Sequence, residues 1–248
     1  MQKYAVLSDI HSNVFALKAV IKDAKRRGVT KFINLGDIFY GPIAPRATYE
    51  ELLDLDIVTI CGNQDRQIFD ATAEEIDSNP TMQFILRDLG EAPLEWMKSL
   101  PFDVQISKSI YACHGTPSDD LVYLLEETTS GRPYVRAEES IRELLGNVDT
   151  QVVLCGHTHI PRCVNLSQGQ RVINPGSVGL QAYTDDEPHL HSMENCTPDA
   201  SYALLEQDND QWQVSFHRVA YDVKSAVNEA LKRDRHDWAH FLATGRKM

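Results

Sequence analysis

The sequence contains no apolar run that approaches the ~20 residues a membrane-spanning helix needs. Its first residues, MQKYAVLSDIHSN, lack a basic region followed by an apolar core, so we expect no signal peptide. Cysteine is scarce: there are five in 248 residues, and none stands in CxxC spacing. We therefore expect reduced thiols in a cytoplasmic protein with no membrane contact.

Positive charge is also in short supply. Lysine and arginine number 24 against 36 acidic residues, which gives a formal net charge of −12. This balance argues against long nucleic acids as partners, because binding them needs Lys and Arg to displace counterions. It does not exclude phosphate chemistry in a cleft that carries its own cations. No repeat or linker divides the chain, so we expect one domain over residues 1–248, with loop or cap segments near 65–100, 117–147 and 180–199.

The first quarter of the chain alternates between two kinds of pattern. Short apolar runs at Tyr4 to Asp9, Lys31 to Asp37 and Asp56 to Asn63 predict strands. Between them, Val14 to Arg27 and Pro45 to Leu53 predict helices, the first from apolar residues at helical spacing. Strand, helix, strand in alternation requires parallel crossovers, so we expect an α/β fold.

The rest of the chain is less regular. We expect helices broken by Pro80 and Pro93 between Asp70 and Leu100, and a buried strand over Gln151 to His159. The acidic stretch Gly179 to Asp199 has no period and predicts a long loop. Further predictions are two strands in FDVQIS and SIYACHG, a partly helical segment from Ser118 to Leu145, hairpins in RCVNLSQGQRVINPGS and in Ala200 to Tyr221, and one amphipathic helix over Asp222 to Gly245.

Five predicted strands end in side chains that can bind a metal: Asp9 and His11, Asp37, Asn63, His114, and His157 and His159. The carboxyl ends of strands in an open α/β sheet face the crevice where ligands bind. Each fragment alone is more often a satisfied polar pair. Together, so many buried carboxylates and imidazoles would be costly to desolvate without a cation, so we expect a metal centre. Nitrogen and oxygen donors without thiolate favour divalent manganese, iron or zinc, with nickel and cobalt as further candidates.

In this order, Asp-x-His, Gly-Asp-(x)3-Gly, Gly-Asn-x-Asp, His and Gly-His-x-His resemble the signature of the calcineurin-like metallophosphoesterases. The resemblance covers Tyr4 to about Ser177 and extends to the small bacterial and archaeal phosphodiesterase-like branch. It implies a four-layer α/β/β/α sandwich of two mixed sheets flanked by helices, with two divalent metal ions between the sheets. Carried over by position, one ion takes Asp9, His11 and His159, the second takes Asn63, His114 and His157, and Asp37 bridges both. A hydroxide shared by the two ions would attack the phosphorus of a phosphoester.

Gln64 departs from the pattern of many members, which carry a histidine at this place, held by the following acidic residue. That histidine helps to bind phosphate and to protonate the leaving oxygen. Glutamine cannot exchange a proton near neutral pH, and general acid assistance is typically worth about 10²–10⁴-fold in rate. We therefore expect hydrolysis of phosphodiesters, or of esters with good leaving groups, with a catalytic set that consists of Asp37, Asn63, His114, Gln64 and Asp65.

Two roles remain open at this point. Asn13 either contacts the substrate phosphate, together with Asn63 and Gln64, or caps the following helix. A replacement acid would come from His189 or His191, although solvated loop histidines are the more ordinary interpretation of that pair.

Two other functions also remain open. The protein could be a phosphomonoesterase acting on nucleotides, small phosphates or phosphoproteins, with its acid supplied from elsewhere. It could also be a non-catalytic metal-binding scaffold, which retention of all seven ligands disfavours. Relatives often carry a short basic loop where this chain has the acidic stretch after Ser177. The acidic stretch indicates a small phosphoester as the substrate rather than a long polyanion.

Overall fold

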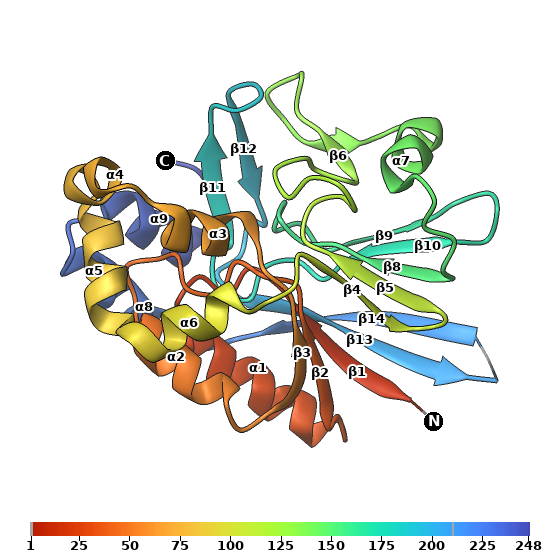
Figure 1. The fold of residues 1–248 in the computed structure, drawn as a ribbon, viewed down its shortest axis with the longest axis horizontal. Coiled ribbons are helices and arrows are strands. Elements are labelled where there is room, and N and C mark those ends of the chain that lie inside the picture. Colours follow the sequence, from red (N-terminus) through yellow and green to blue (C-terminus); the bar gives the residue numbers. More distant parts are fainter. Residues whose placement is uncertain (1, 210) are drawn as a thin grey trace.

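Two five-stranded sheets lie face to face in the computed structural model, which describes residues 2–209 and 211–248 (Figure 1). The first sheet has the strand order β14-β13-β1-β2-β3, in which β1, β2 and β3 are parallel and β13 is antiparallel to both of its neighbours. Its strands are β1 (Lys3–Leu7), β2 (Lys31–Asn34), β3 (Asp56–Thr59), β13 (Ala200–Asp208) and β14 (Gln211–Val219).

The second sheet is mixed as well, with the order β4-β5-β8-β10-β9. Its central strands β5, β8 and β10 are parallel, and β4 and β9 close the two edges as antiparallel partners. The strands are β4 (Asp103–Ser107), β5 (Ile110–Cys113), β8 (Val152–Leu154), β9 (Arg162–Asn165) and β10 (Arg171–Asn174).

Alternation along the strands separates the core into layers. In β1, Tyr4 and Val6 point between the two sheets, while Leu7 points toward the helices outside the first sheet. In β8, Val152 faces the inter-sheet core and Val153 the outer face of the second sheet. Because successive side chains of a strand point to opposite faces, each buried sheet contributes apolar side chains to two layers of the core. The predicted four-layer α/β/β/α sandwich is confirmed.

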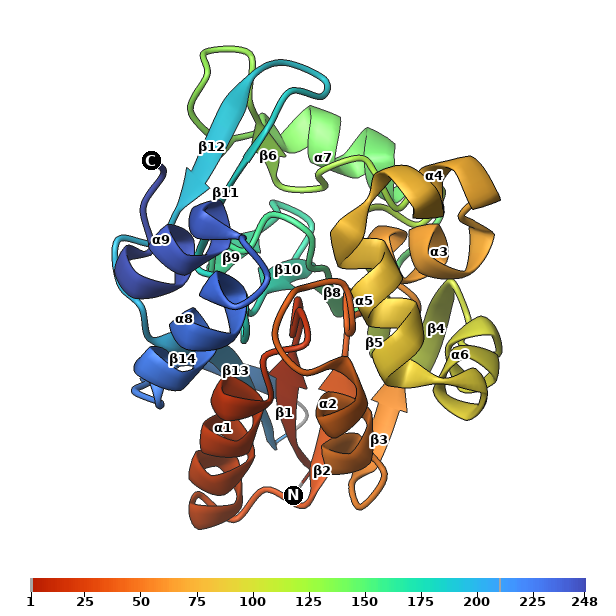
Figure 2. The same ribbon diagram turned by 90° about the vertical axis from the view of Figure 1, so that its left-hand side faces the viewer.

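Helices cover both outer faces. Buried residues of α1, α2, α5 and α6 pack on the first sheet, and Ile141 and Leu145 of α7 pack on the second. In Figure 2, α8 and α9 lie beside α1, and α3 to α6 lie on the opposite side of the same layer. The helices are α1 (Val14–Arg26), α2 (Pro45–Leu52), α3 (Asn63–Asp70), α4 (Ala73–Ser78), α5 (Pro80–Leu89), α6 (Glu91–Lys98), α7 (Glu138–Leu145), α8 (Val223–Leu231) and α9 (His236–Thr244). Within the described residues, no helix has the length and apolar character needed to cross a membrane.

Two helix predictions need correction. Pro80 begins α5 as expected, but Pro93 lies inside the first turn of α6 and does not break it, because N–H groups there have no intrahelical partner. The single helix predicted over Asp222 to Gly245 is two helices. Asp234, with φ 57°, turns the chain between them, which a short polar side chain tolerates better than most.

The stretch Gly179 to Asp199, predicted as a long loop, contains a hairpin of β11 (Ala182–Asp185) and β12 (His191–Glu194). Its strands are too short to show a period in the sequence. They pair with each other, and β11 also packs against α9. A second small hairpin, β6 (Glu126–Glu127) with β7 (Tyr134–Val135), lies at the same end of the molecule (Figure 1).

Candidate metal centre

The loops that follow five strands bring the predicted ligands together from both sheets. Five of these residues have positive φ: Asp9 54°, His11 50°, Asp37 53°, His157 69° and His159 60°. This backbone region disfavours L-residues by roughly 1–2 kcal/mol each. Such strain persists only where the surrounding structure imposes it, and it gathers at functional sites. The packed sheets therefore hold these side chains in directions that free loops would avoid.

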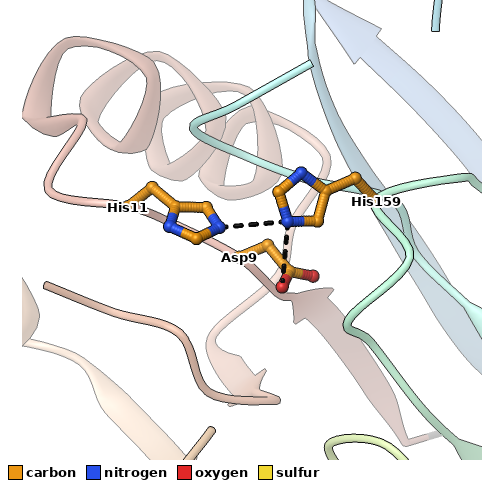
Figure 3. Close-up of side chains that lie close together, drawn as sticks. All are labelled: Asp9, His11 and His159. Carbon is orange, nitrogen blue, oxygen red and sulfur yellow. Dashed lines mark hydrogen bonds and ion pairs between the residues drawn. The ribbon is translucent and has the colours of Figure 1, made fainter. Parts of the chain in front are cut away.

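One cluster contains Asp9, His11 and His159, which offer ligand atoms within 4.8 Å of one another (Figure 3). His159 Nε2 lies 3.0 Å from His11 Nε2 and 3.4 Å from Asp9 Oδ1. All three residues are buried. Residues 148 positions apart in sequence are thus within reach of one ion.

A second cluster contains Asp37, His114 and His157, again with ligand atoms within 4.8 Å. His114 Nε2 lies 3.5 Å from Asp37 Oδ2 and 3.0 Å from Oδ1 of Asn63. The strand predicted to run to Asn63 ends at Thr59, and Asn63 is the first residue of α3. The structure thus brings the residues of both predicted ligand sets together, with Asn63 beside His114. Their binding to metal ions, and the bridging role of Asp37, stay predictions.

Backbone carbonyls fix the orientation of all four imidazoles. A carbonyl oxygen only accepts, so the ring nitrogen beside it carries the proton and the other nitrogen presents a lone pair. This arrangement is typical of metal-binding histidines. The contacts are His11 Nδ1 to Tyr40 O at 2.9 Å, His114 Nδ1 to Leu35 O at 2.7 Å, His159 Nδ1 to Leu180 O at 2.7 Å, and His157 Nε2 to Leu121 O at 3.2 Å.

The first cluster is electrostatically incomplete by itself. With both Nδ1 atoms protonated, His11 Nε2 and His159 Nε2 face each other with lone pairs at 3.0 Å. Asp9 Oδ1 is buried beside them and accepts no hydrogen bond within the described chain. Buried acceptors that lack a donor are destabilising, and a cation among them removes the repulsion. The residues present therefore fit a divalent metal ion.

Charge states agree with this interpretation. Burial lowers the pKa of His11 to about 4, and burial and His114 lower the pKa of His157 to about 4. Burial would lower the pKa of His114 as well, but Asp37 outweighs burial and raises it to about 10. His11 and His157 are thus neutral near pH 7, as ligands must be. A metal ion would take the place of the proton on His114.

Asp65 holds the backbone around the second cluster. Its Oδ1 accepts from the N–H groups of Ile38 at 2.8 Å and Phe39 at 3.4 Å, and its Oδ2 accepts from the N–H of Gly62 at 3.1 Å. Burial and then the nearby Asp37 raise the pKa of Asp65 to about 7. The carboxylate thus joins the loops after β2 and β3, and it acts on Asp37 by positioning it.

Glycine is required where these loops meet. A Cβ at Gly62 would overlap the side chain of Asp37, and Gly36 has φ 95° and lies against the backbone of Gly62. A side chain at either position would therefore separate the loops that carry Asp37 and Asn63.

Gln64 lines the cavity beside the clusters. Its backbone N–H donates to Asp37 Oδ1 at 2.9 Å. Its side-chain Oε1 is buried and has no hydrogen-bond partner within the described residues. The amide cannot transfer a proton.

Asn13 is fully buried and caps α1. Its Oδ1 accepts from the N–H of Ala16 at 3.1 Å, and its Nδ2 donates to Gly179 O at 2.9 Å and to the Tyr221 hydroxyl at 3.2 Å. These bonds support the capping alternative. A contact between Asn13 and substrate stays a prediction.

The ordinary interpretation of the histidine pair in the acidic stretch needs correction for one member. His189 is exposed, but His191 is buried. Its Nδ1 donates to His189 O at 2.6 Å and its Nε2 accepts from the Tyr123 hydroxyl at 3.0 Å. The β11–β12 hairpin encloses His191, whereas a loop would leave it solvated. His191 does not line the cavity at the clusters.

The cavity at the clusters has a volume of about 190 Å³, below the ~300–1,000 Å³ that is usual for drug-sized ligands. Besides the predicted residues His11, Asp37, Asn63, Gln64, His157 and His159, its wall includes side chains that sequence reasoning missed. These come from β11 and from the start of α9: Tyr183, Thr184, Asp185, Arg235, Asp237, Trp238 and Phe241. The three from β11 lie in the segment near 180–199 that was predicted as a loop or cap, although no single residue of it was named. Those of α9 were not marked at all, because helical periodicity assigned the C-terminal segment a packing role only.

Two mixed sheets packed face to face, with buried carboxylates and imidazoles at their facing loop ends, define a metal-binding α/β/β/α sandwich. The family model for the calcineurin-like phosphoesterase superfamily domain matches residues 2–195. The chain belongs to this superfamily, whose metallophosphoesterases are metal-dependent phosphoester hydrolases.

The chain is similar to other proteins over nearly its whole length. An uncharacterized protein of Methanocaldococcus jannaschii, MJ0912, is 26% identical over 245 residues, which is 94% of each chain. The crystal structure of a metallophosphoesterase from Sphaerobacter thermophilus superposes with a TM-score of 0.76 at 24% identity, covering 99% of this chain and all of that one. An archaeal phosphodiesterase is more distant, with a TM-score of 0.44, 16% identity, and coverage of 87% of this chain and 100% of its own.

Proposed function

We propose that this protein hydrolyses phosphodiesters, or phosphoesters with good leaving groups, at a pair of divalent metal ions. The observation that carries the proposal is the place of Gln64 in the cavity wall, beside both ligand clusters and with an unbonded side-chain oxygen. A phosphoester group fits such a wall, but a poor leaving group would find no proton donor in Gln64.

The residues that would hold the metal ions are the six of the two clusters together with Asn63, which lies beside His114. Manganese, iron or zinc suits their nitrogen and oxygen donors, and nickel or cobalt would also be accepted. When bound, two such ions lower the pKa of water and neutralise charge on the phosphoryl oxygens. His11 and His157 are prepared for this task because their low pKa values keep them unprotonated near pH 7.

The surrounding residues position the ligands and the substrate. Asp65 holds the loop that carries Asp37, and the N–H of Gln64 donates to the Asp37 carboxylate. Asp37 would therefore keep its orientation during substrate binding and release. The amide group of Gln64 would donate to or accept from the ester group.

The size and charge of the cavity limit the substrate. A volume of about 190 Å³ is small for a binding cavity, so only part of a large ester would lie inside it. Asp185 and Asp237 add negative charge to that wall. Together with the net charge of −12, this supports a small phosphoester as the substrate rather than a long nucleic acid.

The test is the ratio of diester to monoester turnover. Purified protein with added manganese is assayed with bis(p-nitrophenyl) phosphate and with p-nitrophenyl phosphate, and an alkyl monoester is included as a poor leaving group. We expect the diester to be preferred. Gln64→His should raise alkyl monoester turnover by about tenfold or more, toward the range of general acid catalysis.

Gln67→His is the matched control, because Gln67 is an exposed residue of the same helix. It should leave the ratio unchanged. A clear monoester preference in the unmodified protein would defeat the proposal. Absence of turnover with every ester class, in protein that holds two metal ions, would favour a scaffold instead.

A further inference from the structure

The start of α9 places one cation in the wall of the metal cavity. Of the described residues that line this cavity, Arg235 is the one lysine or arginine. It directly precedes α9, after the turn at Asp234 that separates α9 from α8. The turn thus places Arg235, near the C-terminus, in the same cavity wall as His11 and Asp37 from the first third of the chain.

The guanidinium group of Arg235 is held in a fixed orientation. Its Nε and Nη2 donate to the two carboxylate oxygens of Asp237 at 2.9 and 2.7 Å, and its Nη1 donates to Thr81 Oγ1 at 2.8 Å. An arginine has five N–H donors, so one on each Nη remains unbonded within the described chain. Fixed orientation lowers the entropy lost when a further hydrogen bond forms.

Trp238 connects this group to the first metal cluster. Arg235 Cζ lies 5.3 Å from the centroid of the Trp238 ring, and that ring lies 5.7 Å from the ring of His11 in an edge-on arrangement. The indole is buried and supports the guanidinium from one side. Arg235 is therefore held on the same wall as a metal ligand, with the cavity in front of it.

We propose that Arg235 determines specificity by binding a non-bridging oxygen of the phosphoryl group that the metal centre holds. This assignment rests on the proposed function, since it concerns the substrate of the same site. Guanidinium matches phosphate oxygens in geometry and stays charged at every relevant pH. A histidine at position 64 would both bind phosphate and protonate the leaving oxygen. Arg235 would take over the binding of phosphate but not the donation of a proton.

The neighbouring charges explain why one cation matters here. Asp185 and Asp237 lie in the same wall, and Gln64 is neutral. Without Arg235, a phosphoryl oxygen that points away from the metal ions would meet carboxylates and an uncharged amide. Asp237 is the positioning partner, because it keeps the guanidinium from turning toward solvent.

The test measures binding of inorganic phosphate to manganese-loaded protein by isothermal titration calorimetry. Arg235→Gln should weaken phosphate binding by about 10- to 100-fold, which is the range for hydrogen bonds to charged groups. The phosphate affinity of Arg235→Lys should lie between those of the unmodified protein and Arg235→Gln, because lysine keeps the charge and lacks the planar guanidinium. Manganese content should equal that of the unmodified protein, and with a diester substrate KM should rise more than kcat falls.

Arg233→Gln is the matched control. The side chains of Arg233 and Arg235 are both 26% exposed and both pair with an acidic residue, but Arg233 bonds Glu229 and lies over Phe84 outside the cavity. It should not change phosphate affinity. Thr81→Val removes one hydrogen bond to Arg235 without changing a charge, so it should weaken phosphate binding less than Arg235→Gln does. This variant tests the assignment even if Arg235→Gln folds poorly.

Two results would overturn the assignment: equal phosphate affinity in Arg235→Gln and Arg233→Gln at equal manganese content, or no phosphate binding in the unmodified protein. The calorimetric measurement needs no turnover, so the two proposals can fail separately. Loss of phosphate affinity in Arg235→Gln without hydrolysis of any ester would reject the proposed function and retain the anion site.

Discussion

Replacement of Asp65 by alanine tests whether this carboxylate holds the metal-binding loops together. Its two oxygens accept from the N–H groups of Ile38 and Gly62 at 2.8 and 3.1 Å, and all of these atoms are in the protein interior. In Asp65→Ala these two N–H groups would stay buried without an acceptor, and the N–H of Phe39, which is more distant at 3.4 Å, would lose its acceptor too.

The expected loss follows from these two groups. An unsatisfied buried donor destabilises by about 1–3 kcal/mol, so two give about 2–6 kcal/mol. The pKa of Asp65, raised to about 7 by burial and by Asp37, shows that the carboxylate itself is unfavourably buried. The lower half of the range is therefore expected. For a chain of this size, it corresponds to a fall in melting temperature on the order of 10 °C.

Thermal unfolding of metal-free protein, followed by circular dichroism, measures this loss without any contribution from ligand binding. Asp70→Ala is the control, because Asp70 is exposed at the other end of the same helix. A melting temperature for Asp65→Ala within about 1 °C of the control would refute the reasoning. It would mean that water or a backbone shift satisfies both N–H groups at no net loss.

Two further measurements follow from the site. Manganese at a hundred times its dissociation constant should stabilise the fold by about 2.7 kcal/mol and raise the melting temperature by about 5–11 °C. His11→Gln should lose most of this rise in melting temperature. His191→Gln is the control and should keep the rise, because His191 is buried outside both clusters. Asn13→Ala should destabilise by about 1–3 kcal/mol in urea unfolding, because α1 loses its cap and Gly179 O loses a donor, whereas a change in phosphate affinity alone would assign Asn13 to substrate.

The candidate ligands could be named from the sequence because each stands in a short local pattern, whereas their division into two sets came from the family resemblance. Asp9 and His11, or His157 and His159, stand at the end of an apolar run, and the ends of parallel strands meet at one edge of a sheet. Spacing along the chain therefore carried most of the information about the metal centre. The structure adds what spacing cannot encode, namely the positive φ values of these residues and the carbonyls that select their tautomers.

The environment of the metal centre depended on long-range packing and was not predictable. His191 is buried because two four-residue strands pair and pack, which leaves no period in the sequence. Arg235 enters the cavity because Asp234 turns the chain, where the apolar pattern continues as if one helix ran through. The acidic residue at the place of Asp65 holds a histidine in many family members, and this chain lacks that histidine. The partners of Asp65 are instead backbone N–H groups, which no residue identity reveals.

The family model ends at residue 195, and α9 lies wholly beyond that point. All candidate metal ligands thus lie within the residues that define the superfamily, whereas Asp237 and Trp238 of the cavity wall lie outside them. Mutation could reshape that wall while every metal ligand stays in place. Two homologues with the same seven ligands could then differ in the esters they accept, so the C-terminal residues are the better guide when substrates are compared between them.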